Sequence, residues 1–180
     1  MKKITIREII GATGANLLAE GDAEAALARC IWQVTQNSAE TGEGVLFVAR
    51  RGEKRDGHDF LPQCFERGVT ACLSEKAIKP ENGAVVLLVK STAQALLDMA
   101  AYYRDQFDIP YIGITGSVGK TTTKDMIASV VSQKYKALWT DGNYNNEVGV
   151  PLTIFRIEEQ HQAAIIEMGM NHFGEIDRLA

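Results

Sequence analysis

The stretch that decides the fold is Ile112-Gly113-Ile114-Thr115-Gly116-Ser117-Val118-Gly119-Lys120-Thr121-Thr122-Thr123. Its apolar start predicts a buried strand, and the glycines that follow predict a loop leading into a helix. Backbone N–H groups in such a loop, together with the helix N-terminus, form an anion site. Lys120 adds a positive charge for the outer phosphates of a nucleotide, and Thr121 places a hydroxyl where a phosphate-bound Mg²⁺ needs an oxygen ligand. The stretch therefore predicts a nucleoside triphosphate site.

The glycine spacing is shorter than in the common phosphate loop, G-x-x-x-x-G-K-[ST], because position 114 is Ile rather than Gly. This weakens the interpretation as a generic kinase or GTPase. A simple glycine turn between strand and helix explains Gly116 and Gly119, but it gives no reason for a lysine followed by three threonines. The candidate nucleotide-binding residues of the loop are Gly116, Ser117, Val118, Gly119, Lys120, Thr121 and Thr122.

Composition bounds the class of protein. The chain has 180 residues, 46% of them hydrophobic and 23% charged, which is ordinary for a globular protein with one large or two small domains. Its net charge of −4 argues against nucleic acid as a partner. The three cysteines lack C-x-x-C spacing and favour a reduced, cytoplasmic location. No run of apolar residues is long enough for membrane insertion.

Two units follow from a pass along the chain. The pattern of residues 1–90 predicts a small α/β domain. Its clearest strands are expected over 31–35, 45–49, 69–73 and 85–89, and its helix over 59–68. Residues 91–180 begin with an amphipathic helix over 92–106, capped by Ser91. Then come the strand of the phosphate loop, a helix over 120–134, a strand over 137–140, a helix over 150–156 and a strand over 163–167.

The fold class is therefore α/β. A small N-terminal α/β substrate domain precedes the first part of a P-loop domain with a mostly parallel sheet in three layers. In such sheets ligands gather at the carboxyl ends of the strands.

Two further groups of residues lie at those carboxyl ends. The loop 141–151 packs three Asn into four positions, of which Asn145 and Asn146 are candidates for nucleotide contacts, although a plain connecting loop also fits. Glu167 ends an apolar strand beside the phosphate loop, an arrangement that suits Mg²⁺; the alternative is a solvated charge at the strand end. His172 is not assigned a catalytic role, because a lone His is more often a hydrogen-bonding loop residue.

Four motifs in the same order resemble the Mur ligase family, over nearly the whole chain. They are the shortened loop 114–126, the Asn-rich segment 142–151, the segment 167–176, and the pair 46–49 and 56–60 upstream. The segment 167–176 is most similar to the member that adds D-alanyl-D-alanine to UDP-N-acetylmuramoyl-tripeptide.

The resemblance implies an ATP-dependent, Mg²⁺-dependent, ADP-forming ligase of peptidoglycan synthesis. The tripeptide carboxylate attacks the γ-phosphate of ATP, and the amine of D-alanyl-D-alanine then displaces phosphate from the acyl phosphate. Lys120 and Glu167 are the expected catalytic residues, and Thr121 and Glu167 the expected metal ligands. Ser38, Asp56 and His58 are the expected contacts to the UDP-linked substrate in the N-terminal domain. The intact protein is expected to be a cytoplasmic monomer.

Two departures from the family pattern stand out. The family usually carries Asp-Ser-Arg where this chain has Asn37-Ser38-Ala39, which removes a cationic contact to the substrate. The sequence also stops at Ala180, inside an expected helix, so we expect a fragment that does not ligate alone. The alternatives are a sister Mur ligase or folylpolyglutamate-type synthetase, a free-standing nucleotide-binding module, and a remnant that only binds.

Overall fold

The computed structural model describes residues 1–52, 55–170 and 172–180. It divides into two compact units, one formed by residues 3–99 and the other by residues 1–2 together with 100–180. We call them the N-terminal unit and the phosphate-loop unit. None of the described helices is long and apolar enough to span a membrane.

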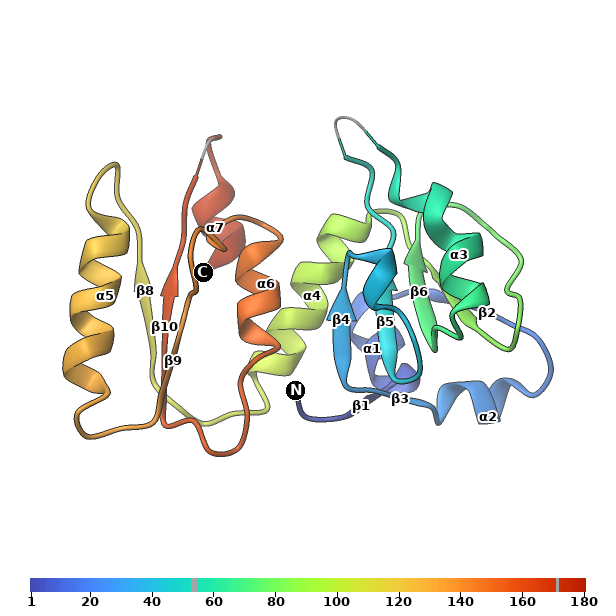
Figure 1. Cartoon of the computed structure of the whole chain (residues 1–180), viewed down its shortest axis with the longest axis horizontal. Coiled ribbons are helices and arrows are strands. Elements are labelled where there is room, and N and C mark those ends of the chain that lie inside the picture. Colours follow the sequence, from blue (N-terminus) through green and yellow to red (C-terminus); the bar gives the residue numbers. More distant parts are fainter. Residues whose placement is uncertain (53–54, 171) are drawn as a thin grey trace. The chain divides into compact units, whose positions relative to one another are not determined.

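The elements alternate between strands and helices along most of the chain (Figure 1). Those before residue 90 are β1 (Ile4–Thr5), α1 (Ile6–Thr13), β2 (Asn16–Ala19), α2 (Ala23–Leu27), β3 (Cys30–Ile31), β4 (Gln33–Thr35), η1 (Ser38–Glu40), β5 (Val45–Val48), η2 (Gly57–Phe60), α3 (Leu61–Glu66), β6 (Ala71–Ser74) and β7 (Val85–Leu88). Those after it are α4 (Thr92–Arg104), β8 (Tyr111–Ile114), α5 (Lys120–Val131), β9 (Ala137–Trp139), α6 (Gly149–Ile154), β10 (Ala163–Glu167) and α7 (Glu175–Leu179).

The N-terminal unit is built on a five-stranded sheet with the order β2-β7-β6-β5-β4. Strands β4 to β7 are parallel, and β2 pairs antiparallel with β7 at the edge. Helix α3 covers one face, where Phe47, Leu61, Phe65 and Val86 form a buried cluster. The predicted α/β class is confirmed for this unit.

Some predicted boundaries in this unit are wrong. The expected strand 31–35 is broken at Trp32, because Cys30–Ile31 pairs with β1 whereas Gln33–Thr35 pairs with β5. The expected helix 59–68 is a 3-10 turn followed by α3, since the Asp56 side chain caps the turn through the N–H of His58. Strand β2 and helix α2 were not predicted; they have four and five residues, too few to show a clear period.

The phosphate-loop unit carries a parallel three-stranded sheet with the order β8-β10-β9. In its register Glu167 lies beside Ile114 of β8, and Ile165 lies beside Trp139 of β9. Figure 1 shows α5 and α6 on opposite sides of these strands, which makes the three predicted layers. All three strands end toward the phosphate loop, so their carboxyl ends form one edge.

The division between the units falls within α4, beyond the predicted boundary at residue 90. Ser91 caps this helix as expected, since its Oγ accepts the N–H of Gln94 at 3.2 Å. The early residues Leu96 and Met99 are buried with the N-terminal unit, whereas Tyr103 belongs to the phosphate-loop unit. One helix therefore contributes buried side chains to both units.

Tyr103 anchors the end of α4 in the phosphate-loop unit. Its side chain is fully buried; the hydroxyl donates to the Ile157 carbonyl at 2.6 Å and accepts the Lys2 N–H at 2.7 Å. Replacing Tyr103 with Phe leaves these groups without that partner, and we expect it to lower the free energy of unfolding of this unit by about 1–3 kcal/mol.

The chain offers a direct readout for this prediction, because its two tryptophans lie in different units: Trp32 in the N-terminal unit and Trp139 in the phosphate-loop unit. Urea unfolding followed by Trp139 fluorescence, in a Trp32→Phe background, measures the second unit alone. Tyr144→Phe, at a side chain 56% exposed, is the control and should change little. Equal midpoints for Tyr103→Phe and the background chain would contradict the anchoring role.

Candidate functional site

The phosphate loop connects β8 to α5. Strand β8 ends at Ile114, and Gly119 precedes the helix with a φ of 76°, a left-handed conformation that glycine adopts without strain. Lys120 is the first residue of α5, and its Nζ donates to the Gly116 carbonyl at 2.8 Å, across the loop. The loop thus carries its positive charge at the helix N-terminus, where anions bind most readily.

Glu167 lies at the centre of the site. It is the last residue of β10 and only 1% exposed, so the alternative of a solvated charge at the strand end is wrong. Its Oε1 accepts from Asn145 Nδ2 at 2.8 Å and from Thr121 Oγ1 at 3.3 Å. Its Oε2 is buried and has no hydrogen-bond partner among the described residues. An unpartnered buried carboxylate oxygen fits a cation or an ordered water.

The Asn-rich loop reaches Glu167 through one of its members. Asn145 donates its side-chain amide to Glu167, and its backbone carbonyl accepts the Gly169 N–H at 2.7 Å. Asn146 has a different place: its Oδ1 accepts the N–H groups of Val148 and Gly149 at the start of α6. The alternative of a residue that only orders a connecting loop therefore fits Asn146 better than Asn145.

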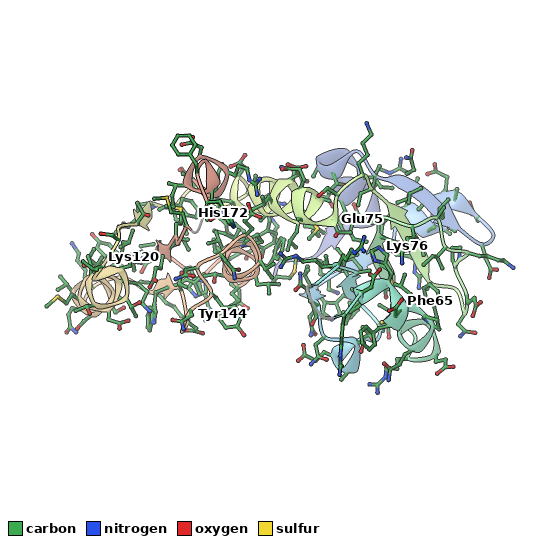
Figure 2. All side chains as sticks on the ribbon, turned by 90° about the horizontal axis from the view of Figure 1, so that it is seen from above. Phe65, Glu75, Lys76, Lys120, Tyr144 and His172 are labelled. Atoms are coloured by element: carbon green, nitrogen blue, oxygen red, sulfur yellow. The ribbon has the colours of Figure 1, made fainter. Side chains whose placement is uncertain are left out.

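These segments enclose a hollow of about 290 Å³ at the carboxyl edge of the sheet. It is lined by Ser117, Val118, Gly119, Lys120, Thr121, Thr122, Asn143, Asn145 and Glu167. Figure 2 looks onto this edge and shows Lys120 at the start of α5 and Tyr144 on the Asn-rich loop. Three segments separated in sequence, each singled out from the sequence alone, meet at one hollow. Gly116 and Asn146 do not line it.

Two residues of the surroundings were missed from the sequence. Lys124 is 3% exposed, and its Nζ donates to the Thr140 carbonyl at 2.9 Å. Thr140 is fully buried, and its Oγ1 accepts the backbone N–H of Glu167 at 3.0 Å. The available signal was the spacing of Lys124, one turn beyond Lys120 on the same helix face.

His172 lies outside this network. Its side chain is exposed, and its backbone N–H donates to Glu175 Oε2 at 3.2 Å. Asn171, part of the predicted segment 167–176, falls outside the described residues.

The predicted substrate contacts lie in the N-terminal unit, at the carboxyl ends of its own parallel strands. Ser38 begins the turn η1 after β4, and its Oγ donates to Gln63 Oε1 at 3.2 Å. Asp56 and His58 bond to each other, Oδ1 to Nδ1, at 2.5 Å. His58 is 4% exposed, and its Nε2 accepts the Glu75 N–H at 2.9 Å, so both ring nitrogens are engaged.

Asp56 joins this group to Lys76. Lys76 Nζ donates to Asp56 Oδ2 at 2.9 Å, and this bond, followed by those from His58, holds the pKa of the Asp56 carboxyl well below its ordinary value. Figure 2 shows Glu75 and Lys76 at this end of the unit. Asp56 and His58 thus order the loop after β5, and Ser38 lies on a neighbouring turn.

No group of three or more His, Cys, Asp or Glu side chains suited to a metal occurs in residues 1–52, 55–170 and 172–180. A cation at Glu167 would thus have one protein carboxylate and the Thr121 hydroxyl nearby. This donor set fits Mg²⁺, which keeps several waters and binds through one or two carboxylates plus phosphate oxygens.

Two family models match the chain: "Mur ligase family, catalytic domain" over residues 31–104 and "Mur ligase middle domain" over residues 114–180. The chain belongs to the Mur ligase family. The middle-domain match begins at the end of β8 and takes in the phosphate loop, the Asn-rich loop and Glu167.

Relatives of known name agree with this assignment. The UDP-N-acetylmuramoyl-tripeptide–D-alanyl-D-alanine ligase of Bacillus subtilis is 46% identical over 75% of this chain and 30% of its own length. A crystal structure of MurF from Acinetobacter baumannii matches 99% of this chain and 38% of its own, with a TM-score of 0.90 and 33% identity. MurF from Thermotoga maritima, in complex with ADP, matches 82% of this chain and 34% of its own, with a TM-score of 0.75 and 33% identity. The chain spans about a third of the length of these Mur ligases.

The close approach of Gly149 to the Asn-rich loop gives a test of the site's packing. A Cβ at Gly149 would lie 2.4 Å from the backbone of Tyr144, which cannot move without shifting Asn145. We expect Gly149→Ala to lower the free energy of unfolding of the phosphate-loop unit by about 1–3 kcal/mol. Trp139 fluorescence during urea unfolding, again in the Trp32→Phe background, measures this loss.

Gly11→Ala is the control for adding a methyl group where there is room, because a Cβ there meets nothing within 4 Å. Gly11 lies in the N-terminal unit, so this variant is followed by Trp32 fluorescence in a Trp139→Phe background. In helix α1 this change should be neutral or slightly stabilising. An unchanged midpoint for Gly149→Ala would show that the loop does not pack on α6 as described.

Proposed function

We propose that this chain is the N-terminal part of a UDP-N-acetylmuramoyl-tripeptide–D-alanyl-D-alanine ligase, which couples ATP cleavage to ADP and phosphate with formation of an amide bond. The observation that carries the proposal is the convergence of the phosphate loop, Asn145 and Glu167 on one hollow. The relatives that bear this name, at 46% identity for Bacillus subtilis, support the choice of substrates.

ATP occupies the hollow of the phosphate-loop unit in this proposal. The Thermotoga maritima relative in complex with ADP supports it. Loop N–H groups and the α5 N-terminus bind the phosphates, and Lys120 exchanges the Gly116 carbonyl, 2.8 Å from its Nζ, for a phosphate oxygen. The ammonium then stabilises the negative charge on the phosphoryl group as it is transferred to the tripeptide carboxylate.

Thr121 and Glu167 hold the Mg²⁺ that accompanies ATP. Support comes from the buried, unpartnered Oε2 of Glu167 and from the contact between its Oε1 and the Thr121 hydroxyl. When bound, this ion neutralises phosphate charge. Asn145 holds the carboxylate in place by donating its side-chain amide to it. Asn146 acts indirectly, because its side chain orders the start of α6.

The N-terminal unit, residues 3–99, binds the UDP end of the substrate in this proposal. Ser38, on the turn after β4, is the proposed direct contact, while Asp56 and His58 order the loop after β5. The arginine that the family usually carries at position 39 has a substitute: Arg67 Nη1 donates to the Ala39 carbonyl at 2.9 Å. A guanidinium beside the turn can supply the cationic contact to a diphosphate.

A cytoplasmic location and a monomeric state belong to the same proposal. Among the three free cysteines, Cys64 and Cys72 are fully buried, and burial raises the pKa of the Cys72 thiol well above its ordinary value. Such thiols are inert core residues, in keeping with a reducing compartment.

Nucleotide binding can be measured on the 180-residue chain. Lys120→Ala removes the charge-assisted contact to phosphate, and we expect the dissociation constant for ATP in the presence of Mg²⁺ to rise about 10- to 100-fold by calorimetry. Lys134→Ala removes the same charge beyond the other end of α5 and should leave the affinity unchanged. Equal affinities for the Lys120 variant and the unmodified chain would remove Lys120 from the site.

The ligase activity is tested on a protein that carries this chain together with the remaining length of its relatives. ADP release is expected only when UDP-N-acetylmuramoyl-tripeptide and D-alanyl-D-alanine are both present. Release with a single amino acid in place of the dipeptide would assign the protein to a sister ligase. Release without either substrate would favour a free-standing nucleotide-hydrolysing module.

A further inference from the structure

Lys124 occupies a position where an apolar side chain is expected. It lies on the face of α5 that packs on the sheet, one turn before the buried Ala128, and only 3% of it is exposed. Burying an ammonium is costly unless it is hydrogen-bonded and paired. A Met or Leu would fill this position without that cost, so the buried ammonium indicates a role that an apolar side chain could not perform.

The partners of Lys124 are unequal. Its Nζ lies 3.1 Å from Asp125 Oδ1, but the Asp125 side chain is 61% exposed, and water weakens such a pair. The buried partner is the Thr140 carbonyl, at 2.9 Å. A hydrogen bond from a charged donor in a buried place is among the stronger ones in a protein.

Thr140 passes this restraint to Glu167. It directly follows β9, and its own N–H donates to the Ile165 carbonyl of β10 at 3.0 Å. Its Oγ1 accepts the Glu167 N–H at 3.0 Å. The backbone of Thr140 is thus held through both its N–H and its carbonyl. This fixes the position of its hydroxyl, which accepts the N–H of Glu167 at the end of β10.

We propose that Lys124 is a positioning residue that, through Thr140, fixes Glu167 so that its Oε1 meets Thr121 and Asn145 and its Oε2 is left for a divalent cation. The proposal rests on the proposed function for the identity of the cation, but its geometric part stands without any ligand. Lys124 does not line the hollow, and its ammonium acts on the site through the Thr140 carbonyl.

The side-chain amide of Asn145 reports this positioning directly, because it donates to Glu167 Oε1 at 2.8 Å. In ¹⁵N-labelled chain without nucleotide or metal, Glu167→Ala gives the resonance of the amide without this bond. We expect Lys124→Met to move the Asn145 amide resonance most of the way to that reference, because the Thr140 carbonyl loses its restraint. Lys124→Arg, which keeps a charged donor, should restore the original resonance.

A second pair of variants tests the relay itself. Thr140→Val removes the hydroxyl that accepts the Glu167 N–H and should shift the Asn145 amide in the same direction, whereas Thr140→Ser keeps the hydroxyl and should not. Asp125→Asn is the control for the exposed ion pair and should leave the resonance in place. An Asn145 amide unchanged in Lys124→Met, with shifts confined to α5 and β9, would overturn the proposal and leave Lys124 a packing residue.

The consequence for binding is measured with ADP in the presence and absence of Mg²⁺. Mg²⁺ is expected to raise the ADP affinity of the unmodified chain, and we expect Lys124→Met to reduce this increase about tenfold, as the loss of one charge-assisted hydrogen bond would. The ADP affinity measured in EDTA should stay unchanged. An equal loss in both conditions would contradict positioning through Glu167. If the unmodified chain shows no gain with Mg²⁺, the proposed metal role fails, while the Asn145 resonance still decides the role of Lys124.

Discussion

The structure of the site depends on a carboxylate that is almost completely removed from water. Glu167 is 1% exposed, and taking an ionised carboxylate out of water costs several kcal/mol unless the protein supplies partners. The partners of the carboxylate come from two segments: Thr121 on α5 and Asn145 on the loop after β9. Thr140, at the start of that loop, accepts the backbone N–H of Glu167. The buried carboxylate thus joins both loops to the end of β10.

Sheet order makes this convergence possible. Strand β10 lies between β8 and β9, so the loops that follow its two neighbours reach the residue at its end. The parallel register places Glu167 beside Ile114, where the phosphate loop begins. A shift of one residue would turn the carboxylate to the other face of the sheet and away from Thr121. Such a crevice at the carboxyl ends of parallel strands is the usual ligand site of open α/β sheets.

Much of this could be predicted from residue types and spacing. The strand over residues 163–167 and the loop chemistry of Lys120 and Thr121 follow from apolar runs and glycine placement, because local preferences and the fold agree there. The different roles of Asn145 and Asn146 could not be predicted. The two residues are adjacent and chemically identical, and only the tertiary structure decides which amide lies beside Glu167. The role of Lys124 could not be predicted for a related reason. Its place on the helix is one where a core residue is expected, and its hydrogen-bond partner Thr140 lies 16 positions away in the sequence.

The central claim is that the buried oxygen of Glu167 serves a divalent cation bound with nucleotide. The most direct measurement compares ATP affinity with Mg²⁺ and with EDTA for the 180-residue chain and for Glu167→Gln, which keeps the size and one acceptor but removes the charge. We expect the unmodified chain to bind ATP more tightly with Mg²⁺ and the variant to lose this difference while keeping its affinity in EDTA. A variant that retains the full Mg²⁺-dependent gain would contradict the claim.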